Sequence, residues 1–189
     1  MLKFAKEFIL SPRNTGAIAP SSSELATTIT RVANLAMAKS VVEFGSGTGV
    51  FTERILENIG RDTIFFAMEI NPVFVKKTQQ RCPNAIVYQD WSYNVKKYLE
   101  NHGQEYCDCI VSGLPWTLFD EAEQSRMLKV ISESLSPNGT FVSFTYLGGN
   151  LSPGGRRFRK FLPEHFSVIS KSRMVWNNLP PAFVYSCTK

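Results

Sequence analysis

The stretch Val41-Val42-Glu43-Phe44-Gly45-Ser46-Gly47-Thr48-Gly49 decides the fold of this chain. Its first half is an apolar run typical of a buried strand, and its second half places a glycine at every other position. Such glycines let the backbone turn sharply and let a ligand approach where a Cβ would collide. The stretch therefore predicts a strand, a ligand-binding turn and the start of a helix.

The spacing of the three glycines distinguishes between classes of ligand. The dinucleotide fingerprint GxGxxG places a pyrophosphate at the helix N-terminus, but here the third glycine comes one residue earlier and Glu43 precedes the turn. A carboxylate there suits a cationic ligand better than a pyrophosphate. The pattern resembles motif I of the class I methyltransferases, whose cofactor S-adenosylmethionine carries an amino group and a sulfonium. This resemblance implies that the cofactor is bound by Glu43, Gly45, Ser46, Gly47, Thr48 and Gly49.

Strands and helices alternate outward from this stretch. We expect strands at 40–44, 63–69, 85–89, 107–112 and 139–146, and helices near 49–59, 72–81, 93–101 and 119–135. This alternation predicts right-handed crossovers and a parallel sheet covered on both faces. Later come a Gly/Pro-rich loop, a short basic helix at 156–162, and two extended runs, 166–175 and 182–188, whose short link requires antiparallel pairing. The sequence therefore predicts an α/β, Rossmann-like fold with a mostly parallel seven-stranded sheet and a C-terminal antiparallel hairpin.

Two further acids follow strands of this predicted sheet. Glu69 ends the second strand, where a carboxylate can accept hydrogen bonds from both hydroxyls of a ribose, and Asn71 and Pro72 are suited to cap and open the next helix. Ile70 could pack on an adenine. Asp90 and Trp91 follow the third strand, where the class I resemblance implies an acid that accepts from the adenine amino group. The sequence therefore predicts one cofactor along the carboxyl edge of the sheet.

The fourth strand ends in Ser112-Gly113-Leu114-Pro115-Trp116. We expect Ser112 and Gly113 to contact the cofactor. Amino-group methyltransferases usually have Asn or Asp where this chain has Gly113, so a flipped base held by a side-chain amide is disfavoured. The remaining lining would be backbone carbonyls and the rings of Trp116 and Tyr146, which suit an amine that becomes a methylated ammonium. Trp116 could equally be a core aromatic residue.

The first 38 residues contain two helical patterns of different kinds. Residues 2–10 place apolar side chains on one arc and Lys3, Lys6 and Glu7 on the other, as in a helix at a lipid interface or one packed on its own domain. Ser21 and Glu24 form a capping-box pattern that would open a helix to about residue 38. We therefore divide the chain into these helices, 1–38, and a methyltransferase domain, 39–189.

Composition and charge exclude several classes of protein. The 189 residues, 43% of them hydrophobic, suit one globular domain, and no apolar run reaches the length of a membrane span. The four cysteines form no CxxC pair, which indicates reduced thiols of a cytosolic protein, and we expect no metal. The net charge is +3 over residues 1–40, −4 over 41–150 and +6 over 151–189. These basic ends face either solvent or an anionic partner.

Nearly the whole chain resembles the soluble bacterial phospholipid N-methyltransferases. The resemblance rests on the glycine motif, Glu69-Ile70-Asn71-Pro72, Ser112-Gly113-Leu114-Pro115, Phe144-Thr145-Tyr146, and two more specific runs, Arg13-Asn14-Thr15-Gly16-Ala17-Ile18-Ala19-Pro20-Ser21-Ser22 and Trp176-Asn177-Asn178-Leu179-Pro180-Pro181-Ala182. It implies methylation of phosphatidylethanolamine on the way to phosphatidylcholine, and an N-terminal helix that binds the membrane.

The resemblance and the residues together define the expected mode of action. We expect residues 2–13 to contact an anionic membrane, Tyr146 to orient the acceptor amine, and Arg156 and Arg157 to hold the lipid phosphate, unless these arginines belong to a solvated basic helix. The protein would be a cytoplasmic, peripheral, monomeric enzyme without a nucleic acid partner. Two alternatives stay open: an RNA methyltransferase, since basic ends could follow phosphates, and a non-catalytic module that binds S-adenosylmethionine.

Overall fold

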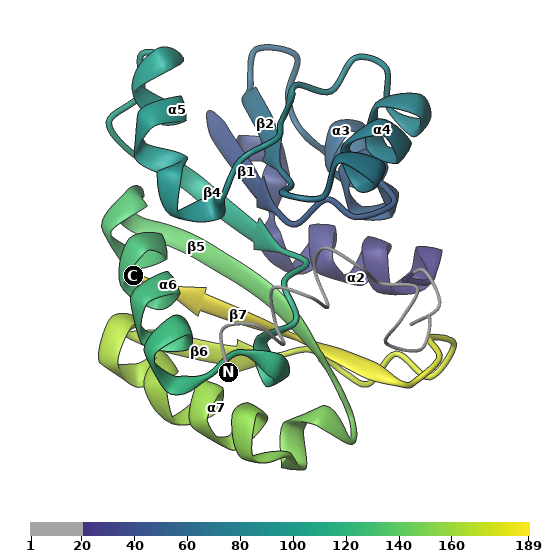
Figure 1. Cartoon of the computed structure of the whole chain (residues 1–189), viewed down its shortest axis with the longest axis vertical. Helices are drawn as coiled ribbons and strands as arrows, with labels where there is room; N and C mark the ends of the chain where they lie inside the picture. The colour runs from purple at the N-terminus through teal and green to yellow at the C-terminus, as the bar shows by residue number, and fades with distance from the viewer. Residues whose placement is uncertain (1–20) are drawn as a thin grey trace.

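One seven-stranded sheet lies between two layers of helices in the computed structural model, which describes residues 21–189 (Figure 1). The strand order is β3-β2-β1-β4-β5-β7-β6, and β7 alone runs antiparallel to both of its neighbours. This arrangement confirms the predicted fold class and the antiparallel C-terminal hairpin. The amphipathic helix predicted over residues 2–10 lies outside the described residues.

The elements follow the predicted alternation. The strands are β1 (Ser40–Phe44), β2 (Ile64–Met68), β3 (Val87–Tyr88), β4 (Cys107–Ser112), β5 (Leu135–Tyr146), β6 (Val168–Lys171) and β7 (Ala182–Thr188). The α-helices within the described residues are α2 (Ser23–Ala33), α3 (Val50–Asn58), α4 (Pro72–Arg81), α5 (Val95–Asn101), α6 (Glu121–Ser134) and α7 (Pro153–His165). Short 3₁₀ turns are η2 (Leu35–Met37), η3 (Ser92–Asn94), η4 (Trp116–Leu118) and η5 (Gly149–Leu151).

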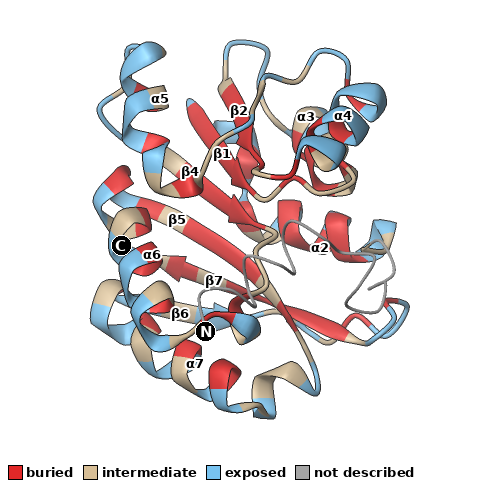
Figure 2. Cartoon of the chain, in the orientation of Figure 1, coloured by how far each residue is buried: buried red, intermediate tan, exposed pale blue. Residues whose placement is uncertain are grey.

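The sheet separates two hydrophobic cores, because successive side chains of a strand point to opposite faces. One core joins the sheet to α5, α6 and α7, and the other joins it to α2 and α3. Figure 2 shows the buried strands between helices whose outer sides are exposed. No helix described between residues 21 and 189 is long and apolar enough to cross a membrane.

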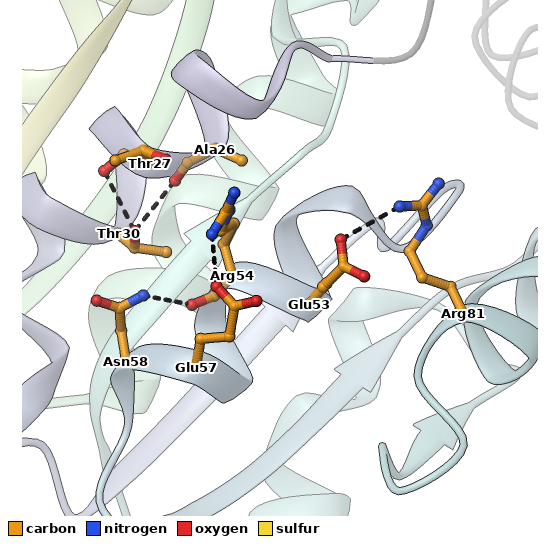
Figure 3. Close-up of polar contacts among 8 residues, drawn as sticks. All are labelled: Ala26, Thr27, Thr30, Glu53, Arg54, Glu57, Asn58 and Arg81. Carbon is orange, nitrogen blue, oxygen red and sulfur yellow. Dashed lines mark hydrogen bonds and ion pairs between the residues drawn. The ribbon is translucent and has the colours of Figure 1, made fainter.

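Helix α2 begins and ends differently from the sequence prediction. Its N-cap is Ser22, whose Oγ accepts from the Leu25 amide at 3.1 Å, so the predicted capping box of Ser21 and Glu24 is wrong. The helix ends at Ala33 rather than near residue 38, since Asn34 adopts the left-handed conformation and η2 follows. Thr30 Oγ1 donates to the carbonyls of Ala26 and Thr27 within this helix (Figure 3).

Two other boundaries extend beyond the prediction. Strand β5 begins at Leu135 instead of residue 139 and includes Asn138 at a positive φ of 63°, next to a register irregularity against β4. Helix α7 begins at Pro153 instead of residue 156, with Ser152 as its N-cap. Proline is well suited to the first position of a helix, because its missing N–H would have no partner there.

Candidate active site

The strand order reverses between β1 and β4, and the predicted cofactor residues gather at this point. Ligands of open α/β sheets bind in the crevice beyond the carboxyl ends of the strands where the order reverses. The turn after β1 and the turn after β4 are in direct backbone contact there, because the Gly113 amide donates to the Phe44 carbonyl at 2.8 Å. The Gly45 amide likewise donates to the Met68 carbonyl, at 2.8 Å. The backbone therefore joins three strand ends into one rim.

The glycine turn adopts a conformation that favours glycine. Gly45, Gly47 and Gly49 have φ angles of 76°, 56° and 81°. Ser46 is buried, and its hydroxyl lies 3.0 Å from that of Thr78 on α4, so its side chain faces the protein interior rather than the crevice. The three glycines and Ser46 can therefore contact a cofactor only through their backbone groups.

Helix α4 fastens the glycine turn from outside. Thr78 Oγ1 donates to the Gly47 carbonyl at 3.1 Å, and Arg81 Nε donates to the Thr48 carbonyl at 3.0 Å. Arg81 also pairs with Glu53 of α3 at 3.2 Å (Figure 3). Thr78 and Arg81 were not among the residues predicted for the site. In the sequence these two residues show only that they lie one turn apart on the same helix. That spacing does not indicate a contact with a loop about thirty residues earlier.

Glu43 is a fully buried acid beneath the turn. One carboxylate oxygen accepts from Thr52 Oγ1 of α3 at 2.6 Å, and among the described residues the other oxygen, Oε1, has no hydrogen-bond partner. Burial raises the pKa of Glu43 to about 8, opposed by the Thr52 hydrogen bond and assisted by the Glu69 charge. A cationic group beside Oε1 would stabilise the carboxylate. The site of Glu43 thus fits an ammonium.

Glu69 has the position predicted for it at the end of β2. It is 5% exposed, and its two oxygens accept from the backbone amides of Gly47 and Asn71, each at 2.9 Å. Burial raises its pKa, and these amide hydrogen bonds lower it in part. The Ile70 amide is a third backbone donor to this carboxylate. A carboxylate has four lone-pair sites, so acceptor capacity remains for a ribose hydroxyl. Asn71 caps α4 and Pro72 opens it, which confirms both predictions. Ile70 follows, partly exposed at the rim.

Asp90 follows β3 and is held by its own segment. Its oxygens accept from the Trp91 amide at 2.7 Å, Asn94 Nδ2 at 2.9 Å and Tyr98 OH at 2.9 Å. Partial burial raises the pKa of Asp90, but the three donors outweigh it and leave the pKa below its usual value. Trp91 is half-buried and stacks near Tyr93. Asp90 is therefore an ionised acceptor in a fixed position, and its contact with adenine stays a prediction.

Gly113 stands where no side chain fits. A Cβ built on it would lie 2.5 Å from the Gly45 carbonyl oxygen. The missing asparagine is thus explained by the close approach of the two turns. Ser112 is buried, and its hydroxyl accepts from the Leu114 amide at 3.3 Å and from Trp116 Nε1 at 3.1 Å. The Ser112 side chain therefore stabilises the loop after β4, and its contact with the cofactor stays a prediction.

The structure corrects the prediction that the Trp116 ring lines the substrate site. The side chain is 2% exposed and stacks on Phe158 of α7, with ring centroids 4.6 Å apart. It belongs to the core beneath α5, α6 and α7, whereas Tyr146 packs on the opposite core, beneath α2 and α3. The sheet therefore separates the two rings, and they cannot form one aromatic lining. Trp116 is the core aromatic residue that the sequence left open as the alternative.

Tyr146 ends β5 at the carboxyl edge, and its ring contacts Phe144 edge-on at 5.4 Å. Burial raises its pKa, so the phenol is protonated at neutral pH and is suited to orient an amine rather than to deprotonate it. It lies on the same face of the sheet as Glu43 and Thr52, because α3 covers that face. Its predicted role remains consistent with this position.

The two arginines that were predicted to hold a phosphate have different environments. Arg157 donates from Nε to Gln124 Oε1 at 3.2 Å and from Nη2 to the Phe119 carbonyl at 2.9 Å. Gln124 is fully buried and also donates to the carbonyls of Trp116 and Gly154. Arg157 therefore braces the loop after β4, which corrects its prediction as a free bidentate phosphate ligand. Arg156 is exposed and retains that possibility.

Neither histidine lies at this edge. His102 follows the C-terminal end of α5, and His165 is the last residue of α7. Both helices start at the carboxyl edge and run back from it, so their C-terminal ends lie at the opposite edge. No cluster of His, Cys, Asp and Glu within residues 21–189 could hold a metal ion.

The fold and the glycine-lined rim are those of the class I methyltransferases. Residues 41–139, just over half of the chain, match the family described as "Methyltransferase domain", and the chain belongs to this family. It is 30% identical, over 187 residues, to an ornithine lipid N-methyltransferase of Singulisphaera acidiphila, covering 97% of this chain and 93% of that protein.

Two solved structures show how common the fold is among methyltransferases. The N-methyltransferase NodS of Bradyrhizobium japonicum WM9 superposes with a TM-score of 0.68 at 15% identity, covering 88% of this chain and 94% of NodS. The O-methyltransferase TomG of Streptomyces achromogenes, solved in complex with SAM, superposes with a TM-score of 0.70 at 16% identity. This match covers 98% of this chain and 89% of TomG. At these identities the likeness concerns the fold alone.

The cofactor is S-adenosylmethionine, as predicted. The residues present fit it, since Glu43 offers a buried carboxylate oxygen to an ammonium and Glu69 offers an acceptor to a ribose hydroxyl. When bound, it supplies a methyl group activated by a sulfonium. The glycine turn, fixed by Thr78 and Arg81, presents backbone groups at the same rim. The chain is therefore an S-adenosylmethionine-dependent methyltransferase.

Proposed function

We propose that this enzyme methylates the primary amine of a lipid head group, of the phosphatidylethanolamine type, at a membrane surface. The proposal is carried by one observation, the 30% identity to a lipid N-methyltransferase across 97% of the chain. A match of this extent includes the substrate side as well as the glycine motif. In this proposal the protein is a monomer in the cytoplasm that binds the membrane through residues 2–13.

The substrate side of the structure supports an amine acceptor outside a nucleic acid. Gly113 has no room for the side-chain amide that would hold a flipped base. The carboxyl edge carries exposed apolar side chains, among them Leu147 at 43% and Leu151 at 67%. A nucleic acid interface is rich in basic and polar contacts and poor in such side chains, so the RNA alternative is less well supported.

In this proposal the residues of the chain contribute to catalysis mainly by positioning the acceptor amine relative to the methyl group. The amine must lose its proton first, because an ammonium nitrogen has no lone pair, and one proton is released for each nitrogen–carbon bond formed. Tyr146 would accept or donate a hydrogen bond that directs the lone pair toward the methyl group, and Arg156 would pair with the lipid phosphate. Holding nitrogen, carbon and sulfur in line in a site shielded from water can supply most of the rate acceleration.

The test is radiolabelled methyl transfer by the full chain to purified lipids in detergent micelles and to total RNA, side by side. We expect label in phosphatidylethanolamine and a product that co-migrates with its monomethyl derivative. Label in ornithine lipid alone would contradict phosphatidylethanolamine as the substrate and favour the lipid named for the 30% identical relative. Label in RNA alone would overturn the lipid proposal, and cofactor binding without any labelled acceptor would favour a non-catalytic module.

Replacing Tyr146 tests its role within the same assay. Tyr146→Phe keeps the ring and removes the hydroxyl, so we expect kcat to fall by about tenfold to a hundredfold with little change in cofactor affinity. The matched control is Tyr106→Phe, an exposed tyrosine that precedes β4 at the opposite edge. Equal activity of both variants would remove Tyr146 from the mechanism.

A further inference from the structure

The loop between β6 and β7 presents two large apolar side chains to the outside. Trp176 is 69% exposed and Leu179 is 79% exposed, although each directly adjoins one buried residue. Val175 and Asn178 are only 3% and 2% exposed. Exposed tryptophan and leucine side chains only three residues apart are unusual on a surface that contacts only water, and such a pair can mark an interaction site.

The loop is held in this pose by side-chain hydrogen bonds to the first turn of α2. Asn178 Oδ1 accepts from the Ser22 amide at 2.9 Å, and Asn178 Nδ2 donates to the Pro180 carbonyl at 2.7 Å. Asn177 Nδ2 donates to Glu24 Oε2 at 2.6 Å. Asn178 is therefore buried under the loop, Asn177 is exposed but bonded to α2, and the flanking side chains Trp176 and Leu179 are exposed. Because hydrogen bonds already hold this loop in one conformation, its apolar side chains lose little conformational entropy when they bind a partner.

The tip lies at the edge of the sheet that carries the methyl-transfer site. Strand β6 ends and antiparallel β7 begins at the carboxyl ends of the other strands, as Figure 1 shows for the yellow hairpin loop beside α2. The Leu147 amide, just after β5, donates to the Pro181 carbonyl of this loop at 2.9 Å. Leu147 and Leu151 are exposed on the adjoining loop. The apolar tip thus continues the rim on which a lipid head group would be methylated.

The charge around the tip identifies its partner. From residue 165 to residue 189 the chain contains no acidic residue, and Lys171 and Arg173, both exposed, precede the tip. The exposed acid Glu24 of α2 accepts from Asn177 beside the tip, so the basic character of this surface is the excess of two cations over one carboxylate. Tryptophan favours the boundary between head groups and acyl chains, and nearby lysine and arginine are attracted to anionic lipids. Apolar tip and basic flank together match an anionic membrane surface.

We propose that the Trp176–Leu179 tip is a membrane-inserting anchor, in which the two side chains enter the interface of an anionic bilayer and hold the carboxyl edge against it. The biological role of this anchor rests on the proposed function, but its binding to a membrane can be measured independently of that function. It acts in addition to any contact made by residues 2–13, and it places the amine acceptor and the cofactor rim on one side of the protein.

The experiment uses the full chain and vesicles of phosphatidylcholine with and without phosphatidylglycerol. We expect the double variant W176A/L179S to partition onto anionic vesicles about tenfold to a hundredfold more weakly than the unchanged protein, the factor for two partly buried apolar side chains. The matched control is Met37→Ser, which removes an 85% exposed apolar side chain next to the amino end of β1. It should bind like the unchanged protein.

Fluorescence places the tip in the bilayer directly. Lipids brominated along the acyl chains should quench the tryptophan emission of the unchanged protein, and W176F should lose this quenching although it retains Trp91 and Trp116. Undiminished vesicle binding by W176A/L179S, or equal quenching in W176F, would overturn the anchor. So would a loss of self-association in the double variant without a change in vesicle binding, since the tip would then be an interface between copies.

Activity in detergent separates this inference from the proposed function. W176A/L179S should methylate lipid in micelles at the normal rate and should fail on vesicles. If the unchanged protein binds vesicles through the tip but methylates no lipid in either form, the proposed function is wrong and the anchor stands. Normal activity of the double variant on vesicles would contradict the anchor and leave the proposed function intact.

Discussion

The two halves of the carboxyl edge are built by different means. On the side of β1 and β2, two buried acids, Glu43 and Glu69, receive short hydrogen bonds from Thr52 and from backbone amides. On the side of β4 to β7, the loop after β4 rests on the aromatic core that includes Trp116, whereas the β6–β7 loop is bonded to α2 and exposes Trp176 and Leu179. The first half offers fixed carboxyl and backbone groups to the cofactor, and in our proposal the second half meets a lipid surface.

The largest expected effect comes from the buried acid of the cofactor half. Glu43→Gln preserves the acceptor for Thr52 and removes the charge that faces the cofactor ammonium, so we expect cofactor binding to weaken by about 2–5 kcal/mol, as for one partner of a buried charge pair. The free energy of unfolding at neutral pH should change little, because the variant removes the cost of protonating a buried acid but places an unpaired amide NH2 at the position of Oε1. Calorimetric titration and denaturant unfolding measure the two quantities, and unchanged affinity would refute the role of Glu43.

Glu69→Ala should have the next largest effect. It removes the acceptor for a ribose hydroxyl and leaves the amides of Gly47 and Asn71 without their present partner, so affinity for the cofactor should weaken by about 1–3 kcal/mol. Stability should decrease as well, unlike in Glu43→Gln. Isothermal titration of Glu69→Gln, with one acceptor oxygen left, should give an intermediate value. If Glu69→Ala binds normally, the ribose lies elsewhere.

A pair of neighbouring arginines tests the substrate half. Arg157→Ala removes donors to Gln124 and to the Phe119 carbonyl and should lower the free energy of unfolding by about 1–3 kcal/mol. Arg156→Ala alters an exposed residue and should change stability by no more than about 0.5 kcal/mol while raising KM for lipid. Chemical denaturation of both variants measures the change in stability, and kinetics with lipid micelles measures the change in KM. An effect on KM from Arg157 alone would reverse these assignments.

The smallest expected effect is a proton released when the cofactor binds. Since the pKa of Glu43 is about 8 in the free protein, the carboxyl is mostly protonated at pH 7 and ionises beside a bound ammonium. Titration at pH 7 in two buffers of different ionisation enthalpy should show release of up to about one proton, and none in Glu43→Gln. Identical heats in both buffers would contradict the raised pKa.

The same pKa fixes the pH dependence of stability. The folded protein holds the Glu43 proton at pH values where the unfolded chain has lost it, because the pKa rises from 4.5 to about 8 on folding. The stabilisation from this group is complete below pH 4.5 and decreases as the pH rises through 8. Unfolding of the cofactor-free protein should therefore become easier across this range, and less so in Glu43→Gln.

The cofactor half could be predicted from the sequence because its signals are local. Glu43 and the glycines lie within one short motif, Asn71 and Pro72 follow Glu69 directly, and the structure places all of them at one rim. The parallel direction of the strands then needs only the alternation of strands and helices, which the sequence shows clearly.

The substrate half could not be predicted in the same way. The burial of Trp116 depends on Phe158, and the bracing role of Arg157 depends on Gln124, so each is decided by a helix far away in the sequence. Gly154 and Gly155 looked like loop residues, but a Cβ on either would lie 2.2 Å from a carbonyl oxygen of the adjoining turns. Close packing of this kind allows α7 to begin early, and no local pattern reveals it.

The backbone contact between Gly45 and Gly113 joins the two halves mechanically. The turns touch without intervening side chains, so a shift of one by a few tenths of an ångström must displace the other. The loop after β4 is consequently not an independent flap. A cofactor that displaces the glycine turn would therefore also displace the loop after β4.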